Sequence, residues 1–145
     1  MVPPPWVYAG AFLVVLVLHW LWPLPISDHP AVIGIGMALV CLGVALDAWG
    51  AYSMIRAKTP IDPYRSATAV VTFGAFAWSR NPLYVGLHLV FLGLSFILNT
   101  GWGVLAFIPV VLVIHYGVIR REERYLEARF GEPYRRYCAT VRRYG

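Results

Sequence analysis

Four long apolar runs, separated by polar segments, make up most of the chain. They lie at about 6–24, 31–55, 82–98 and 102–119. An apolar helix of roughly 20 residues crosses the hydrocarbon core of a bilayer, so each run predicts a transmembrane helix. The third run is the shortest, and we expect its helix to tilt little or to lie where the bilayer is thinned. The pattern predicts an all-α integral membrane fold with four transmembrane helices.

The polar segments between these runs are of two kinds. The turns at 27–30 and 99–101 are only long enough to reverse the chain, whereas segment 56–80 and the tail 120–145 are longer and basic. We expect the tail to continue the fourth helix as far as Gly131, because glycine readily adopts the conformation that ends a helix. A second tail helix then follows. The whole chain is expected to form one membrane domain, with a helical tail that completes its functional site.

Composition supports this class of protein. The chain is 59% apolar and only 13% charged, and residues 1–27 contain no Lys, Arg, Asp or Glu. Such a chain is typical of integral membrane proteins rather than of soluble domains. The first apolar run lacks a basic leading region, so it predicts a membrane span rather than a cleavable signal peptide.

The distribution of positive charge predicts the topology. All twelve Lys and Arg residues fall within 56–80 or 120–143. By the positive-inside rule both regions face the cytoplasm, and four spans then place both termini there too. We expect an integral protein of the bacterial inner membrane whose basic face attracts anionic lipid headgroups.

The net charge and the two cysteines give no support to a nucleic-acid-binding, disulfide-bonded or metal-binding protein. The net charge of +5 follows from the topology, and the chain has no pattern typical of nucleic-acid recognition. Cys41 lies within a span and Cys138 in the tail, so the pair predicts neither a disulfide nor a metal site.

The start of the third run reads Arg80-Asn81-Pro82-Leu83-Tyr84-Val85-Gly86. Asn81 is a good N-cap residue and Pro82 suits the first helical position. The free amides of a helix N-terminus carry partial positive charge, and with Arg80 beside them they favour an anionic group such as a carboxylate. The alternative is an interfacial anchor in which the arginine and tyrosine reach the headgroups.

Two adjacent acids, Glu122 and Glu123, follow the fourth run. The hairpin at 99–101 makes the third and fourth helices antiparallel neighbours, so these acids emerge on the same surface as Arg80. A carboxylate pair and an arginine at one mouth can bind a zwitterion. The alternative is a solvated helix face with ion pairs four residues apart.

Both regions resemble one enzyme family. The stretch VVTFGAFAWSRNPLYVG (70–86) resembles the "LVTSGxYxxxRHPxYxG" signature of isoprenylcysteine carboxyl methyltransferases, and also of their short bacterial relatives and of phospholipid N-methyltransferases. The tail, from Glu122-Glu123 through Phe130-Gly131 to Val141, is similar to "EExxLxxxFGxxYxxYxxxV" of the same family. The two motifs, in this order, span roughly the C-terminal half of the chain.

The resemblance implies an integral-membrane methyltransferase that holds S-adenosylmethionine between the two motifs at the cytoplasmic face. It gives Arg80, Glu122 and Glu123 catalytic roles. The residues it implies for cofactor binding are Thr72, Gly74, Arg80, Asn81, Pro82, Tyr84, Gly86, Glu122, Glu123, Tyr134 and Tyr137.

One position departs from the signature. The family has His where this chain has Asn81, although many short bacterial relatives also read Arg-Asn-Pro, so Asn81 is expected to replace the imidazole. The resemblance is greatest to isoprenylcysteine-type carboxyl O-methylation of a lipophilic acceptor that enters from the bilayer. Amine N-methylation of a phospholipid and S-methylation of a thiol remain alternatives. A carboxylate acceptor needs no base, whereas an amine or thiol must lose its proton.

Three ionisable residues, Asp47, His88 and His115, lie two to three turns inside the predicted cytoplasmic boundary. Intramembrane ionisable residues are functional candidates, and we expect these three to line the acceptor pocket, where one can serve as a base. His115 and Glu122 are seven apart and are expected to share a helix face. The alternative is that the three side chains hydrogen-bond one another.

Two other classes of protein stay open. His88 and His115, at similar depth on neighbouring helices, fit the axial ligands of a haem in a membrane electron carrier. A purely structural membrane subunit is the third possibility.

Overall fold

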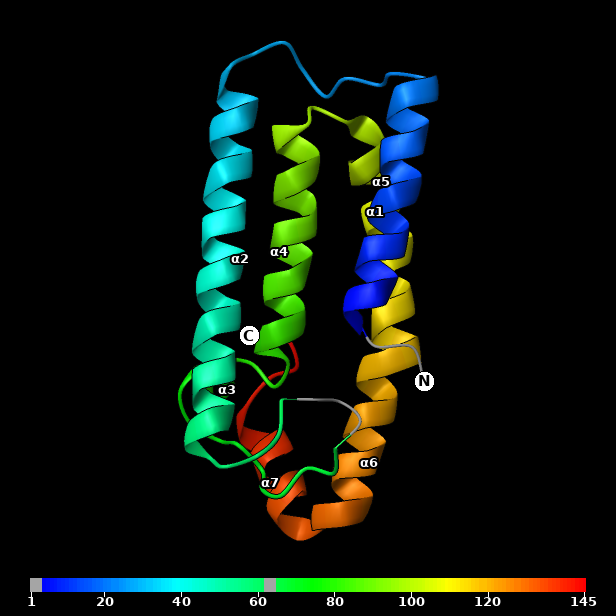
Figure 1. The fold of residues 1–145 in the computed structure, drawn as a ribbon. Coiled ribbons are helices and arrows are strands. Elements are labelled where there is room, and N and C mark those ends of the chain that lie inside the picture. Colours follow the sequence, from blue (N-terminus) through cyan, green and yellow to red (C-terminus); the bar gives the residue numbers. More distant parts are fainter. Residues whose placement is uncertain (1–3, 62–64) are drawn as a thin grey trace.

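The computed structural model describes residues 4–61 and 65–145, and every regular element in these ranges is helical (Figure 1). The elements are α1 (Pro4–Leu21), α2 (Ala31–Arg56), α3 (Ala75–Trp78), α4 (Pro82–Ile97), α5 (Gly101–Ile114), the π-helical segment η1 (His115–Ile119), α6 (Arg120–Phe130) and α7 (Glu132–Thr140). Helices α1, α2, α4 and α5 run side by side, and α3, α6 and α7 gather at one end of this bundle, hereafter the basic end.

Three helices in the described part of the chain are long and apolar enough to cross a membrane: α1, α2, and the continuous helix Gly101–Phe130 formed by α5, η1 and α6. Their outward faces are apolar, and the side chains of Leu13, Leu42 and Ile108 are 62%, 61% and 63% exposed. Apolar surface of this extent is suited to lipid rather than to water. The chain is therefore an integral membrane protein.

Helix α4 is shorter than these three. Its 16 residues span about 24 Å at 1.5 Å per residue, less than the roughly 30 Å of a hydrocarbon core. The sequence predicts four spans; three are confirmed as helices of spanning length, and a crossing by α4 stays a prediction. Because α4 is short, its first residues lie nearer the middle of the molecule than the ends of α2 and α6 do (Figure 1).

The first helix differs from the predicted range of 6–24. It begins at Pro4 and ends at Leu21. Prolines are tolerated in the first turn, where no amide is needed for a helical bond. The earlier end has a local cause, because Pro23 disfavours helical backbone at the residue before it.

Glycines allow α2 and α4 to pack closely. Gly36 and Gly43 on α2 face Gly93 and Gly86 on α4, and a side-chain carbon at Gly36 would lie 2.7 Å from the Gly93 carbonyl oxygen. Small residues at a membrane helix contact let backbones approach until van der Waals packing is dense. This contact is the most extensive between two helices of the described structure.

The buried core lies on the other side of α4. Tyr8 and Val15 of α1 pack there with Phe91 of α4 and with Val110 and Ile114 of α5. The rings of Tyr8 and Phe91 have centroids 6.3 Å apart. Helix α1 therefore covers the faces of α4 and α5 that lie away from α2.

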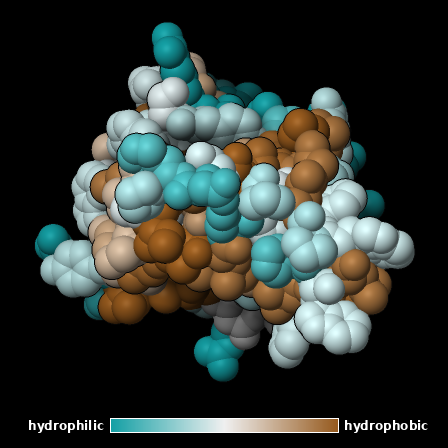
Figure 2. Space-filling view, turned by 90° about the horizontal axis from the view of Figure 1, so that it is seen from above, coloured by the Kyte–Doolittle hydropathy of each residue, from teal (hydrophilic) through white to brown (hydrophobic). Residues whose placement is uncertain are grey.

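At the end of the bundle opposite the basic end, side-chain hydrogen bonds join the two connections between helices. The Asn99 side-chain oxygen accepts hydrogen bonds from the backbone amides of Ile26 and Ser27, and the Trp102 indole donates to the Trp22 carbonyl. Seen from this end, hydrophilic side chains lie over the middle of the molecule and hydrophobic ones along its flanks (Figure 2).

Candidate functional site at the basic end

The site is built around the start of α4. Pro82 occupies the first turn of the helix, as predicted. The predicted cap is wrong, because the Asn81 side chain makes no capping bond to the helix. Its Nδ2 instead donates to the carbonyl oxygen of Arg143, at 3.2 Å. The side chain therefore fastens a distant segment rather than the first turn.

That segment is the C-terminal strap, residues 141–145. Its Arg142 carbonyl accepts a hydrogen bond from the Arg80 amide at 3.0 Å, and its Arg143 carbonyl also accepts one from the Ser79 hydroxyl at 3.0 Å. Ser79 Oγ in turn accepts from the Asn81 amide. The strap thus runs along the residues that lead into α4, and the chain ends beside the start of that helix (Figure 1).

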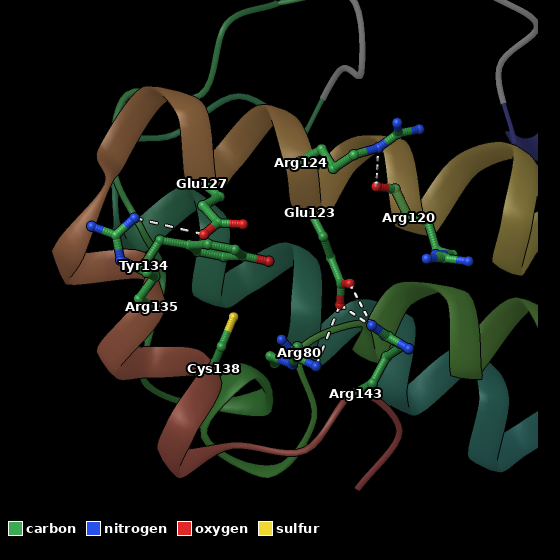
Figure 3. Close-up of a pocket in the computed structure, with 9 residues that line it drawn as sticks. All are labelled: Arg80, Arg120, Glu123, Arg124, Glu127, Tyr134, Arg135, Cys138 and Arg143. Carbon is green, nitrogen blue, oxygen red and sulfur yellow. Dashed lines mark hydrogen bonds and ion pairs between the residues drawn. The ribbon is translucent and has the colours of Figure 1, made fainter.

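Glu123 joins this strap to the first motif. Its two carboxylate oxygens accept hydrogen bonds from Nε and Nη2 of Arg143 at 3.0 and 2.8 Å, and Oε1 lies 3.5 Å from Nη2 of Arg80 (Figure 3). The Glu123 and Arg80 side chains are only 15% and 14% exposed. The hydrogen bonds to Glu123 raise the pKa of Arg143. The Arg80 Nε atom is buried and has no partner.

Glu122 has a different partner. Its Oε2 accepts a hydrogen bond from the Tyr84 hydroxyl at 2.7 Å, which links α6 to the first turn of α4. No cation pairs with Glu122 in the described part of the chain. The two motifs therefore meet, as predicted, at two contacts: one carboxylate held by arginines and one held by a phenol.

A pocket of about 330 Å³ opens beside the contacts of Glu123 with Arg80 and Arg143 (Figure 3). Its lining combines arginines and carboxylates with one aromatic ring. The lining residues are Arg80, Arg120, Glu123, Arg124, Glu127, Tyr134, Arg135, Cys138 and Arg143. Arginines outnumber the acids, so the pocket favours a ligand that carries at least one negative group.

The tail tyrosines support this pocket. Tyr134 and Tyr137 are both buried, and the Tyr137 hydroxyl donates to the Phe76 carbonyl of α3 at 2.7 Å. Burial raises the pKa of both hydroxyls, so they stay protonated. Tyr134 lines the pocket, whereas Tyr137 positions α3 beneath it.

Three of the residues predicted to bind the cofactor lie outside the pocket lining. Thr72 is exposed on the connection before α3. Gly74 has φ +62° and begins α3, packed on Ser53, whose hydroxyl accepts from the Ala75 amide. Gly86 is buried against α2, where any side-chain carbon would overlap the Asp47 carboxylate. The structure gives Gly74 and Gly86 packing roles, and contact with a cofactor remains a prediction for all three.

Asp47 packs against Gly86 on the α2 side of α4, whereas His88 contacts a residue that sequence reasoning missed. Tyr8 of α1 packs edge-on against the His88 ring, at a centroid distance of 5.5 Å, and Asp47 is near enough to act on Tyr8 electrostatically. The other edge-on neighbour of His88 is Phe107. Tyr8 lies in an apolar helix, and nothing in the neighbouring sequence indicates that it contacts His88.

His115 has different neighbours. Its Nδ1 hydrogen-bonds the Tyr144 hydroxyl of the C-terminal strap, and its ring packs on Tyr116. His88 and His115 thus contact separate aromatic rings, an arrangement that does not favour a shared haem. Among the described residues, no group of three or more His, Cys, Asp or Glu side chains is placed to hold a metal ion.

The expected shared face of His115 and Glu122 is wrong. Residues 115–119 form a π-helical segment rather than α-helix. A π turn holds an additional residue, so it rotates everything that follows relative to the preceding helix. As a result His115 meets the strap while Glu122 meets Tyr84.

The fold and the site together define a helical membrane protein with an arginine-rich pocket of about 330 Å³ where its two motifs meet. Residues 31–133 match the model of the phospholipid methyltransferase family. The chain belongs to this family, whose members are membrane methyltransferases. It is also similar to an uncharacterized protein of Haemophilus influenzae, with 42% identity over 62 residues, which cover 43% of this chain and 98% of that protein.

Proposed function

We propose that the protein transfers a methyl group from S-adenosylmethionine to a lipophilic acceptor, with the cofactor held at the basic end and that end facing the cytoplasm. The observation that carries this proposal is the meeting of the two motifs: Arg80 with Glu123, both of which line the pocket, and Tyr84 with Glu122. When bound, the cofactor supplies an electrophilic methyl group on a sulfonium.

The residues present fit such a cofactor. S-Adenosylmethionine has a carboxylate and an ammonium on its amino-acid part. The pocket offers guanidinium groups for the carboxylate, and one of them, that of Arg80, has a buried Nε atom without a partner. A guanidinium binds a carboxylate through paired hydrogen bonds, so Arg80 is our candidate for this contact. Tyr134 is the aromatic surface available to the adenine ring.

The ammonium contact is assigned to Glu122 rather than to Glu123. Two guanidinium groups already surround Glu123, and they largely neutralise it. Glu122 does not line the pocket, but it accepts from the Tyr84 hydroxyl and has no ion pair among the described residues, so it is available to a further cation. Tyr84 then orients Glu122, and the Glu123 cluster holds Arg80 and the C-terminal strap in place. Positioning of this kind supplies much of the catalysis of a displacement reaction.

The acceptor is proposed to enter from the bilayer. The outward faces of α1, α2 and α5 are apolar, and Arg80, two residues before the start of α4, lines the pocket. The sequence motifs favour carboxyl O-methylation. The family match favours phospholipids. Both acceptor classes are lipophilic.

The proposal is tested by methyl incorporation. Membranes that contain the protein are incubated with S-adenosylmethionine labelled on its methyl group, and label is measured in the lipid extract. We expect incorporation above that of membranes without the protein, and its loss in Glu122→Gln and Arg80→Ala. The matched control is Arg121→Ala, which changes an exposed arginine outside the pocket. A folded wild type that labels no extractable molecule would overturn the proposal.

A further inference from the structure

The C-terminal strap, residues 141–145, is held in place by polar contacts. It follows the end of α7 at Thr140, it forms no helix or strand, and none of its five residues is buried. Its backbone carbonyls accept hydrogen bonds from residues 79–81, and its Arg143 guanidinium binds Glu123. A surface segment with few apolar contacts opens at a lower free energy than the packed helices beside it. The strap can therefore open while the bundle stays folded.

Two consecutive residues of the strap contact different parts of the molecule. Arg143 lines the pocket. Tyr144 contacts His115, through a hydrogen bond to Nδ1 and with ring centroids 5.8 Å apart. His115 belongs to the spanning helix Gly101–Phe130 and precedes Glu122 by seven residues, or about 10 Å along the helix. The strap thus extends from the pocket to a deeper level of the bundle.

The surroundings of Tyr144 are part surface and part interior. Its own side chain is 40% exposed, and it lies near Tyr116, which is 58% exposed on the outside of the spanning helix. Tyr144 is also near enough to Tyr8 to act on it electrostatically. Tyr8 is only 6% exposed, and its hydroxyl has no partner among the described residues. Tyr144 therefore lies where the outward face of the bundle meets its interior.

We propose that the C-terminal strap is a gate between the bilayer and the pocket. In the closed state it separates a lipophilic molecule in the bilayer from the pocket, and it opens when Tyr144 leaves His115 and Arg143 leaves Glu123. The inference rests on the proposed function and deepens it, because it names the part of the chain that controls the entry of the acceptor.

The contacts of Glu123 allow the gate to open without loss of the site. Glu123 binds two guanidinium groups, those of Arg143 and Arg80. When the strap leaves, Arg80 stays beside the carboxylate, so the mostly buried Glu123 keeps a cation. Removal of the sole partner of a buried charge is strongly unfavourable, and the shared arrangement avoids this penalty.

The π-helical segment supplies the other contact of the gate. His115 is its first residue, and the additional residue of a π turn directs His115 to the strap while Glu122 meets Tyr84. Single π turns within α-helices recur at functional sites. The irregular turn thus gives the spanning helix one contact with the strap and a separate contact with the start of α4.

Cys138 is a natural reporter for the gate, because its thiol lines the pocket. The protein is placed in lipid nanodiscs without cofactor. Two reagents with the same maleimide group are compared: N-dodecylmaleimide, which enters the bilayer, and N-(2-carboxyethyl)maleimide, which stays in water. Mass spectrometry measures the rate at which each modifies Cys138 and separates this residue from Cys41 on α2. The ratio of the lipid-borne to the water-borne rate reports entry from the bilayer, since a change in the reactivity of the thiol affects both rates.

Two substitutions loosen the gate at its two contacts. Tyr144→Phe keeps the ring and removes the hydroxyl, and we expect the ratio to rise about threefold. Addition of Arg143→Gln removes the paired bonds to Glu123, and the double variant should raise the ratio at least about tenfold. The matched control is Arg142→Gln, which removes the same charge from an exposed side chain of the strap. Its ratio should equal that of the wild type.

Three results would overturn the inference. The first is an unchanged ratio in the folded double variant, or in Tyr144→Phe if the double variant does not fold. The second is an equal acceleration of both reagents, which describes a strap that covers the pocket from water. The third is a ratio that Arg142→Gln raises as much as Tyr144→Phe does.

This outcome is distinguishable from that of the proposed function, because no adenosyl compound takes part. If the wild type binds S-adenosylhomocysteine and the ratio does not respond, the gate fails and methyl transfer stands. If the ratio responds and no adenosyl compound binds, the strap controls access to the pocket and methyl transfer fails.

Discussion

The Glu123 carboxylate is bound through both oxygens by the guanidinium of Arg143, twenty residues further along the chain. This contact closes the C-terminal strap over the residues that lead into α4. Glu123 therefore has a structural role that the neighbouring acid, Glu122, does not share, since the hydrogen bond that Glu122 makes is to Tyr84.

We predict that Glu123→Gln lowers the free energy of unfolding by about 2 kcal/mol, because two charge-assisted hydrogen bonds are lost from a mostly buried side chain. Thermal unfolding in detergent measures the change, and faster removal of the last residues by a carboxypeptidase reports the release of the strap. The control is Glu127→Gln, which changes an exposed acid with a single ion pair at 3.7 Å. Its expected cost is below about 0.5 kcal/mol. Equal effects of the two variants would contradict the structural role of Glu123.

Gly36→Ala is expected to destabilise the protein by about 1–3 kcal/mol, because the added carbon would lie 2.7 Å from the Gly93 carbonyl oxygen and 2.8 Å from the Ile97 side chain. Gly34→Ala, two residues away on the same helix, meets no atom within 4 Å. Alanine is a better helix former than glycine, so this control should be neutral or stabilising by up to about 1 kcal/mol. Thermal unfolding of the two variants measures the difference between them. If Gly34→Ala is as unstable as Gly36→Ala, close packing of α2 on α4 is not the cause of the destabilisation.

Glu132 is predicted to titrate below its ordinary pKa of 4.5, because Arg135 and Arg136 hydrogen-bond its carboxylate at the start of α7. A carboxyl group with a depressed pKa in the folded state stabilises that state at pH above its unfolded pKa. The stabilisation is lost as the pH falls through the folded value. A carbon-13 NMR titration of the Glu132 carboxyl measures the midpoint, and a midpoint at or above 4.5 would refute these contacts.

Local patterns were sufficient to predict most of the helices. The second, third and fourth apolar runs agree with α2, α4 and the α5–η1 helix to within one or two residues. Gly131 ends α6 with φ +61°, and a new helix begins at Glu132, as predicted. These features depend on apolar length and on glycine and proline, which act on their immediate neighbours.

The features that could not be predicted depend on contacts between residues far apart in the sequence. Nothing near Arg143 or Tyr144 indicates that the strap returns to Glu123 and His115, and Tyr8 lies in an apolar run that gives it no special status. The π-helical segment could not be predicted either, because its sequence, His115 to Ile119, has an ordinary helical pattern. The meeting of the two motifs could be predicted, because the short turn at 99–101 makes α4 and α5 antiparallel neighbours.

The central claim is that the two motifs together form a cofactor site, and calorimetric binding of S-adenosylhomocysteine tests it most directly. We predict micromolar binding by the wild type in detergent, and a loss of affinity of at least about tenfold, or 1.4 kcal/mol, in Arg80→Ala and in Glu122→Gln. Arg121→Ala should bind as the wild type does. A folded wild type without measurable binding, or variants of Arg80 and Glu122 with unchanged affinity, would contradict the claim.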